Sequence, residues 1–305
     1  MAEAAMTRPV VRALSTAAGA GELLLRPAAL LSRSQGQGAV LRETAHRPWP
    51  LPHEPWLMAQ TWEDLLFAHW PVPPERLRPL LPPSVPLDVR EGSAWVGVTP
   101  FRVSAIRLRG VPHLARITTF PELNVRTYAT LHGKPGIWFM SLDAASAFAV
   151  FGARRTYRLP YFKASMECRE KGGWIEYRSR RLSRSAEPAE LAGRYRPTGP
   201  EAPPPPGSLE HWLTERYCLY TLDRHGDVLR ADIHHPPWPL RTAEATFELN
   251  TMAEPYGLEL DQPPPLLHFA RRQDVLIWPL ARAQPASTAA GISAYSRKNS
   301  SQTRM

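Results

Sequence analysis

The sequence has few cysteines and no long apolar run, and both shortages narrow the kind of protein it can encode. Only two cysteines occur among its 305 residues, Cys168 and Cys218, so no disulfide framework is predicted and a reducing compartment suits the chain. The longest uncharged stretch of the central region is the ten residues 144–153. A helix needs about 20 apolar residues to cross a membrane. We therefore expect a cytoplasmic protein without a membrane span.

The sequence motifs that mark common enzyme classes are missing. There is no GxGxxG or GxxxxGK[ST] loop, no HExxH or CxxC metal motif and no GxSxG nucleophile turn. The adjacent His234 and His235 would point to opposite faces of a strand, which favours a strand end over a metal site. Kinase, dehydrogenase and common hydrolase templates lose support, and neither a metal nor an organic cofactor is implied.

Positive charge is in excess, but its distribution disfavours a nucleic-acid-binding protein. Of the formal net charge of +9, residues 1–45 carry +2, residues 283–305 carry +3 and residues 46–282 carry +4. More than half of the excess therefore lies in the two ends of the chain. The one dense cluster is typical of a solvated strand edge or loop and comprises Arg178, Arg180, Arg181 and Arg184.

The chain divides into one domain with two extensions. Residues 1–45 show no sustained hydrophobic period, which predicts a disordered basic extension or a start codon assigned too far upstream. Residues 283–305 are small and polar and predict a disordered tail. Between them, residues 46–282 form the predicted domain. The 34 prolines of the whole chain, about 11% of its residues and roughly twice average usage, disfavour long helices.

Within the domain, short strands are predicted to alternate with proline-rich loops. Hairpins are indicated at Gly172-Gly173 and at Gly226, and short helices over 75–81, after Asp143 as a cap, and after Ser208 as a cap. Without a strand–helix alternation, the pattern favours an antiparallel barrel or sandwich of eight to ten strands. The predicted strands are 94–103, 123–130, 137–142, 162–169, 174–179, 217–222, 228–234, 246–250 and 274–278.

A polar stripe on one predicted strand is the candidate for chemistry. Four same-face positions on that strand, which are unsuited to an apolar core, are Glu122, Asn124, Arg126 and Tyr128. The following strand and helix add Ser141, Asp143, Arg154 and Tyr157. Such a set can hold a small anion or carbonyl compound, with arginine binding a carboxylate and a buried acid acting as a base. The alternatives are a surface Glu122–Arg126 pair on an open sheet face and Asp143 as a helix cap alone.

The sequence resembles the YqjF family, a bacterial group carried as a domain of unknown function. The resemblance runs in order over about 46–281 and is carried by RPWPLP (47–52), DLLFAHWPVPPERLRPLLP (64–82), AWVGVTPFRV (94–103), ELNVRTYA (122–129), GKPGIWFMSLDA (133–144), ARRTYRLPYFKASM (153–166), LTERYCLY (213–220) and HPPWPL (235–240). That family is similar to the acetoacetate-decarboxylase-like superfamily. The resemblance implies a mainly β fold, an antiparallel cone-shaped β-barrel with a few short helices around a central cavity. The decarboxylases form large oligomers, so it also implies a homo-oligomer.

The sequence departs from the superfamily at its catalytic lysine. The enzymes use a Pro-Lys-Lys sequence to form a Schiff base with a β-keto acid, and the matching place here reads Pro160-Tyr161-Phe162. Neither aromatic residue supplies an amine. Lys163 lies two residues beyond Tyr161, about 6.6 Å further along a strand, which is too far for a site that tolerates about 0.5 Å.

Two functional hypotheses remain open. The first is a protein, enzyme or not, that binds a small carbonyl or carboxylate compound without a Schiff base. In it Arg126 clamps the anion, Glu122 or Asp143 serves as the acid/base, and the pocket is lined by Asn124, Tyr128, Ser141, Arg154, Tyr157 and Tyr161. The second is a non-catalytic ligand-sensing or protein-interaction module on the same barrel, which the missing lysines favour. Nucleic-acid binding is the least favoured.

Overall fold

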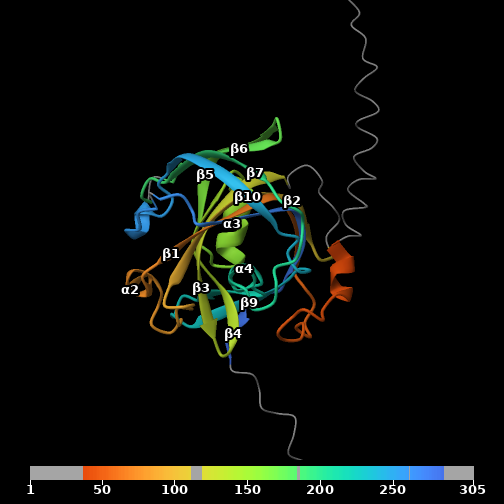
Figure 1. Ribbon diagram of the computed structural model, residues 1–305. Coiled ribbons are helices and arrows are strands. Elements are labelled where there is room, and N and C mark those ends of the chain that lie inside the picture. The colour runs from red at the N-terminus through yellow and green to blue at the C-terminus, as the bar shows by residue number, and fades with distance from the viewer. Residues whose placement is uncertain (1–36, 111–118, 184–185, 261, 285–305) are drawn as a thin grey trace, which may run out of the picture.

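The structure, a computed structural model, describes residues 37–110, 119–183, 186–260 and 262–284 (Figure 1). Within these residues twelve strands join in one sheet: β1 (Met58–Val72), β2 (Ala94–Leu108), β3 (Phe120–Leu131), β4 (Lys134–Ala144), β5 (Tyr161–Lys171), β6 (Trp174–Arg181), β7 (Glu190–Pro197), β8 (Cys218–Leu222), β9 (Val228–His234), β10 (Arg241–Asn250), β11 (Leu266–Ile277) and β12 (Ala281–Arg282). The helices are short: α2 (Pro74–Leu77), α3 (Ala147–Thr156), α4 (Leu209–Thr214), and the 3-10 turns η1 (Val40–Arg42), η2 (Arg78–Leu80) and η3 (Glu254–Tyr256).

Five long strands in the order β4-β3-β2-β1-β11 form a central sheet that closes on itself by two routes. Strands β10, β7, β6 and β5 lead from β11 back to β4 and close a nine-stranded barrel. Strands β9 and β8 also lead from β11 to β4 and close a second, seven-stranded ring. All pairings are antiparallel except those of β4 with β5 and with β8. The predicted mainly β barrel with a few short helices is confirmed, and the two parallel pairings make it mixed.

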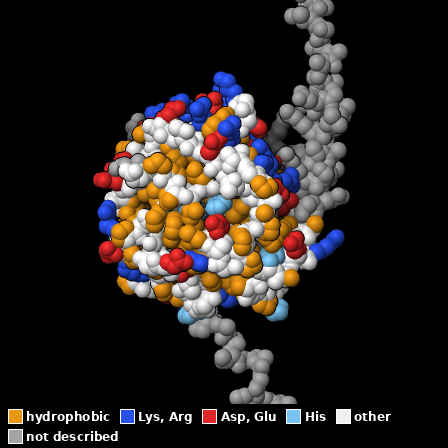
Figure 2. All heavy atoms as spheres, in the orientation of Figure 1, with side chains coloured by type: hydrophobic (Ala, Val, Ile, Leu, Met, Phe, Trp, Pro, Cys, Tyr) orange, Lys and Arg blue, Asp and Glu red, His pale blue; other side chains and the backbone are white. Residues whose placement is uncertain are grey.

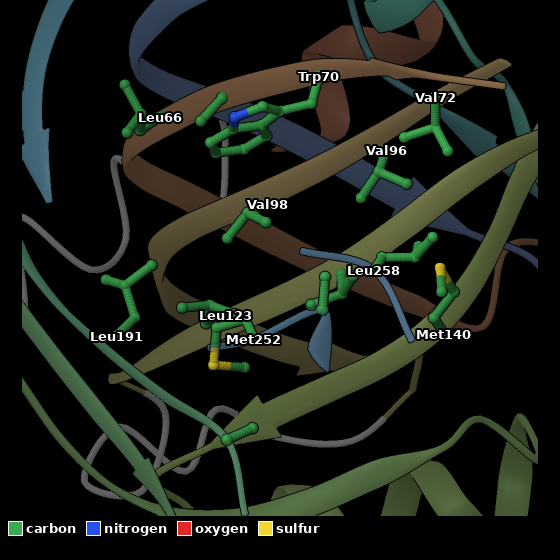
Figure 3. Close-up of a cluster of buried hydrophobic side chains, with 14 of the residues drawn as sticks. Leu66, Trp70, Val72, Val96, Val98, Leu123, Met140, Leu191, Met252 and Leu258 are labelled. Carbon is green, nitrogen blue, oxygen red and sulfur yellow. The ribbon is translucent and has the colours of Figure 1, made fainter. Parts of the chain in front are cut away.

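Each face of the central sheet is covered by a different apolar core. Alternate side chains of a strand point to opposite faces. On β1, Leu66, Ala68 and Trp70 therefore enter the first core, inside the nine-stranded barrel (Figure 3), which Met252 and Leu258 also enter. Their neighbours Leu65 and Phe67 enter the second core, which β8, β9 and α3 cover. On the molecular face in Figure 2, apolar side chains gather toward the middle and most Lys and Arg lie at the edge.

Bulges bend the central sheet, which belongs to both the nine-stranded barrel and the seven-stranded ring. Asp64 and Ala105 have left-handed backbone conformations, with φ of 52° and 48°, and the register between β1 and β2 shifts beside each. Bulges of this kind increase the twist and bend of a strand. The Asp64 bulge is held by the Tyr195 hydroxyl, which donates to its carbonyl oxygen over 2.7 Å, and by ion pairs from Arg102 and Arg271 to its carboxylate.

Most predicted elements occur, with one long omission. The hairpin at Gly172-Gly173 joins β5 and β6, the hairpin at Gly226 joins β8 and β9, and Ser208 caps α4 by accepting from the His211 amide. Strands β1, β7 and the two-residue β12 are not among the predicted strands. β1 was missed because its residues 65–70 are buried on both faces, so no alternation of apolar and polar residues marks it.

The folded part reaches further toward the N-terminus than the predicted domain boundary. Gln37 is buried and its side-chain amide donates to the Ala105 carbonyl oxygen over 2.9 Å, and Val40 packs with Trp56 and Trp278. Residues 1–36 and 285–305, which hold most of the two predicted extensions, lie outside the described residues.

The predicted cap of the second helix is wrong. Strand β4 continues through Ala144, and Ser146 caps α3 by accepting from the Ala149 amide over 3.2 Å. Asp143 instead points across the first core and pairs with Arg181, which donates from Nε and from an Nη atom over 2.9 and 2.7 Å. Arg181 is thus buried, whereas Arg178 and Arg180 of the same predicted cluster are exposed, as expected. Arg184 lies outside the described residues.

The Asp143–Arg181 pair predicts a large cost for removing one partner. The two side chains are 0% and 2% exposed, so Asp143→Asn leaves a buried guanidinium without its counter-charge. We expect the free energy of unfolding to fall by about 3–5 kcal/mol in urea denaturation. Glu244→Gln, which breaks the exposed Arg196–Glu244 pair, is the matched control and should cost less than about 1 kcal/mol. Equal losses in the two variants would contradict this account of Asp143.

Candidate functional site

The four polar residues of the predicted stripe lie on one face of β3, here called the inner face, which turns toward the second core. Directly opposed residues of antiparallel strands point to the same side. Glu122 is opposed by Phe101 and Ala144, and Asn124 by Thr99 and Leu142. Phe101, Leu142 and Ala144 belong to the second core. Glu122 and Asn124 are therefore buried between the central sheet and the β8, β9 and α3 cover, while Tyr128 packs with Trp95 and Leu213, so the stripe does not lie on an open sheet face.

A glycine makes room for the two basic side chains of the inner face. Gly97 of β2 is opposed by His69 of β1 on one side and by Arg126 of β3 on the other. A Cβ atom at Gly97 would lie 3.2 Å from the His69 ring and 3.4 Å from Cγ of Arg126. Such contacts are tighter than ordinary van der Waals distances, so glycine at this position lets His69 and Arg126 lie side by side.

Arg126 is a buried cation without an anion. Its residue is 5% exposed, and within the described part of the chain no carboxylate pairs with it. Its guanidinium carbon lies 5.0 Å from the centre of the Phe67 ring and 5.8 Å from that of Tyr128. Aromatic faces attract a cation, but charged side chains are almost never buried without a partner. The inner face therefore carries an uncompensated positive charge.

Glu122 is a buried acid that burial keeps protonated. The Tyr161 hydroxyl lies 3.1 Å from both carboxyl oxygens and donates to them. Burial raises the pKa of Glu122 to about 8; the hydrogen bond from Tyr161 opposes this rise, and the charge of Asp143 adds to it. At neutral pH the group is mostly the neutral acid, so it does not balance Arg126. It can donate a proton or a hydrogen bond to a bound molecule.

His69 joins the site although the sequence did not single it out. Its Nε2 atom and the Tyr128 hydroxyl are hydrogen-bonded over 2.6 Å, and both side chains are fully buried. Burial lowers the pKa of His69 well below its ordinary value, and the charge of Arg126 lowers it further. The imidazole is therefore neutral at pH 7. In the sequence, His69 lies in the segment DLLFAHWPVPP (64–74), most of which belongs to β1. No local pattern marks this histidine, because β1 itself is not predicted.

Several buried polar atoms without a hydrogen-bond partner belong to this face or to the second core beside it. In the described residues they include Thr99 Oγ1, Asn124 Oδ1, Arg126 Nε, His69 Nδ1, Tyr157 Oη and Trp238 Nε1. Buried polar atoms are nearly always satisfied, so a cluster of unpartnered ones calls for an explanation. Donors and acceptors both occur in the set, which is what a small polar molecule requires of its binding site.

The structure brings six of the nine predicted site residues together and separates three. Glu122, Asn124, Arg126, Tyr128, Tyr157 and Tyr161 line the inner face or the second core beside it. Ser141 and Asp143 are opposed by Val125 and Leu123, whose side chains enter the first core, so both point away from the inner face. Arg154 is exposed on α3, where it donates to the Tyr161 carbonyl oxygen over 2.6 Å.

The described residues offer neither a metal site nor a membrane-spanning helix. Among the described residues, no three His, Cys, Asp or Glu side chains lie close enough together to hold a metal ion. His234 and His235 are instead buried: His234 binds the Val40 carbonyl oxygen over 2.8 Å, and His235 stacks on Tyr217. Within the same residues, no helix has the length and apolar character to span a membrane.

The arrangement of strands is that of the acetoacetate-decarboxylase-like proteins. Acetoacetate decarboxylase from Legionella pneumophila subsp. pneumophila str. Philadelphia 1 superposes with a TM-score of 0.52 at 13% identity, covering 79% of this chain and 93% of that one. The enduracididine biosynthesis enzyme MppR complexed with pyruvate superposes with a TM-score of 0.53 at 12% identity, covering 80% and 96%. At these identities the likeness defines the fold class alone.

The family follows from sequence. The model of the family DUF2071, described as an uncharacterized conserved protein, matches residues 59–274. The uncharacterized protein YqjF of Bacillus subtilis (strain 168) is 46% identical over 227 residues, which are 74% of this chain and 93% of that protein. The chain belongs to the DUF2071 family, and the resemblance seen in the sequence is confirmed.

The protonated state of Glu122 predicts a pH-dependent stability. A raised pKa means that the folded state binds more protons than the unfolded state between about pH 4.5, the ordinary value for a carboxyl group, and about pH 8. The contribution of Glu122 to the free energy of unfolding should therefore fall as pH rises through this window, by on the order of 1 kcal/mol per pH unit.

Glu122→Gln removes the titrating group and its contribution, so the free energy of unfolding of the wild type minus that of the variant should fall as pH rises from 5 to 8, measured by urea denaturation at pH 5 to 9. Glu176→Gln on the exposed side of β6 is the matched control and should retain the wild-type slope. A Glu122→Gln profile that parallels the wild type would mean that Glu122 is ionised in the folded protein.

Proposed function

We propose that this protein binds a small carboxylate or carbonyl compound at the inner face, with Arg126 as the anion-binding residue. The main support for this proposal is that Arg126 is buried beside Phe67 and Tyr128 and that, among the described residues, no acid is paired with it. A guanidinium binds a carboxylate through two parallel hydrogen bonds. A bound carboxylate would supply the counter-charge that the surrounding side chains do not.

Glu122 gives the proposed site a second pole. Four residues along a strand, it lies about 13 Å from Arg126 between Cα atoms, with Asn124 between them on the same face. The two side chains can approach a molecule of a few carbon atoms from its two ends. Arg126 then holds the anionic end, while the neutral Glu122 holds a proton at the carbonyl or hydroxyl end. Asn124 Oδ1 and Thr99 Oγ1 are unpartnered and lie between these poles.

The neighbours of known structure support a small organic acid as the ligand class. MppR has been solved complexed with pyruvate, which is a carboxylate with an adjacent carbonyl group. Because this likeness is one of fold, it supports the class of compound and not a particular compound.

Schiff-base chemistry is not part of the proposal. Tyr161 and Phe162 stand where the decarboxylases have lysines, and Tyr161 binds Glu122 through its hydroxyl. The amine of Lys163 donates to the Ala145 carbonyl oxygen. Proton transfer from Glu122 is the chemistry that we propose for an enzyme, while a ligand sensor needs the Arg126 contact alone. Glu122→Gln separates the two: binding that persists with loss of turnover indicates an enzyme.

The proposal predicts that ligand stabilisation depends on Arg126. In a thermal-shift screen of short keto acids, hydroxy acids, lactones and acyl compounds, a ligand at 100 times its Kd should add about 2.7 kcal/mol, or roughly 5–10 °C in Tm. Arg126→Met should abolish that shift. Because the substitution removes an unpaired buried charge and keeps an unbranched, flexible side chain, the Tm of the unliganded variant should equal or exceed that of the wild type.

Arg180→Ala, an exposed arginine of β6, is the matched control and should retain the full ligand shift. A hit whose shift survives Arg126→Met would place the ligand elsewhere. If no compound raises the Tm of the well-folded protein, the hypothesis of a protein-interaction module would be favoured instead.

A further inference from the structure

A groove opens along the edge of β4 that faces away from β3. At this edge the strand pairing that closes the nine-stranded barrel gives way to the one that closes the seven-stranded ring. That edge pairs with β8 at Ile137 and Trp138 and with β5 from Leu142 to Ala144. Between these two pairings, Phe139 and Met140 line a groove of about 410 Å³, here called the seam groove. This volume falls within the range of small-molecule sites. The seam groove therefore results from the exchange of partner strands along one edge.

The floor of the seam groove is apolar. Trp138, Phe139, Met140, Leu159 and Leu222 contribute most of it. The hydroxyl groups that line it are already used within the protein. Tyr220 donates to the Lys134 carbonyl oxygen over 2.6 Å, Tyr256 to that of Met140 over 2.6 Å, and Thr221 to that of Arg158 over 3.0 Å. These side chains present carbon to the groove rather than free donors.

Arg158 is the one charged residue that lines the seam groove. It is exposed, and among the described residues its guanidinium has no hydrogen bond or ion pair. Its backbone φ is 53°, a left-handed conformation that costs a non-glycine residue free energy. The flanking Tyr157 and Leu159 are buried in the second core, which holds Arg158 outward at the groove.

We propose that the seam groove binds an amphipathic anion, with an aliphatic or aromatic body on the apolar floor and a carboxylate on Arg158. Charge complementarity selects this occupant, since the lining holds one free cation and no acid. An apolar alcohol would lack the ionic contact, and an amphipathic cation would be repelled. The groove and the inner face meet at Phe139, which is opposed by Arg126 and packs with Leu159 in the second core, and Arg126 does not line the groove.

The test uses the full chain and sodium octanoate, with 1-octanol and octylammonium chloride as probes of the same length and different charge. Isothermal titration calorimetry should give a Kd for octanoate at least tenfold lower than for either other probe. In protein labelled at the methionine methyl groups, octanoate should shift the resonance of Met140, which lines the groove, and leave in place that of Met252, which belongs to the same first core but does not line the groove. Met140→Leu assigns the signal.

Arg158→Asn is the decisive variant. Asparagine accepts the left-handed conformation more readily than arginine, so the Tm should equal or exceed that of the wild type. The preference for octanoate over 1-octanol should fall to less than twofold. Arg155→Asn, an exposed arginine of α3, is the matched control and should keep the preference.

The proposal would be overturned by equal affinity of the wild type for octanoate and 1-octanol, by an unchanged preference in Arg158→Asn, or by an unmoved Met140 resonance. Loss of octanoate binding in Arg126→Met but not in Arg158→Asn would also overturn it, since the ligand would then lie on the inner face. The proposed function depends on Arg126 and short organic acids, so either proposal can fail while the other stands.

Discussion

The structure depends on a five-stranded sheet that is buried on both faces. Because side chains alternate along a strand, every second residue of β1 to β4 must satisfy one core and its neighbour the other. Such strands cannot tolerate a slip of one residue, since a slip would exchange the two sets. The left-handed residues Asp64 and Ala105 fix the register between β1 and β2, and Tyr195 and two arginines anchor the first of them.

This constraint explains which predictions from sequence succeeded. Local signals were sufficient where one residue type determines a turn or a cap, as at Gly172-Gly173 and Ser208. The alternation of Glu122, Asn124, Arg126 and Tyr128 correctly predicted one shared face. Strand β1 was missed because burial on both faces erases the alternation on which that reasoning relies.

The side of the sheet on which β4 places its polar residues could not be predicted. Ser141 and Asp143 do share a face, as their spacing requires. Which face it is depends on the register with β3, where Asp143 is opposed by Leu123, and register is a property of the paired strands. His69 and Gly97 belong to the site for the same reason, since cross-strand pairing places both beside Arg126. Long-range pairing therefore determines the composition of the site, and the local pattern determines only its central strand.

The electrostatics of the inner face differ from those of the rest of the interior. Asp143 and Arg181 neutralise each other across the first core, as do Asp88 and Arg216 near Tyr128. On the inner face, the acid is protonated, the imidazole is neutral and the arginine alone remains charged. A core selected only for stability would pair or replace such a charge, because burying it unpaired is unfavourable. Sites that bind ligands retain this kind of local cost.

The same argument applies with less force to Arg158, whose charge is solvated and whose left-handed backbone conformation is the unfavourable feature. Both arginines are held by neighbours that belong to the second core, so the packing of that one core positions the two candidate anion contacts on opposite sides of β4.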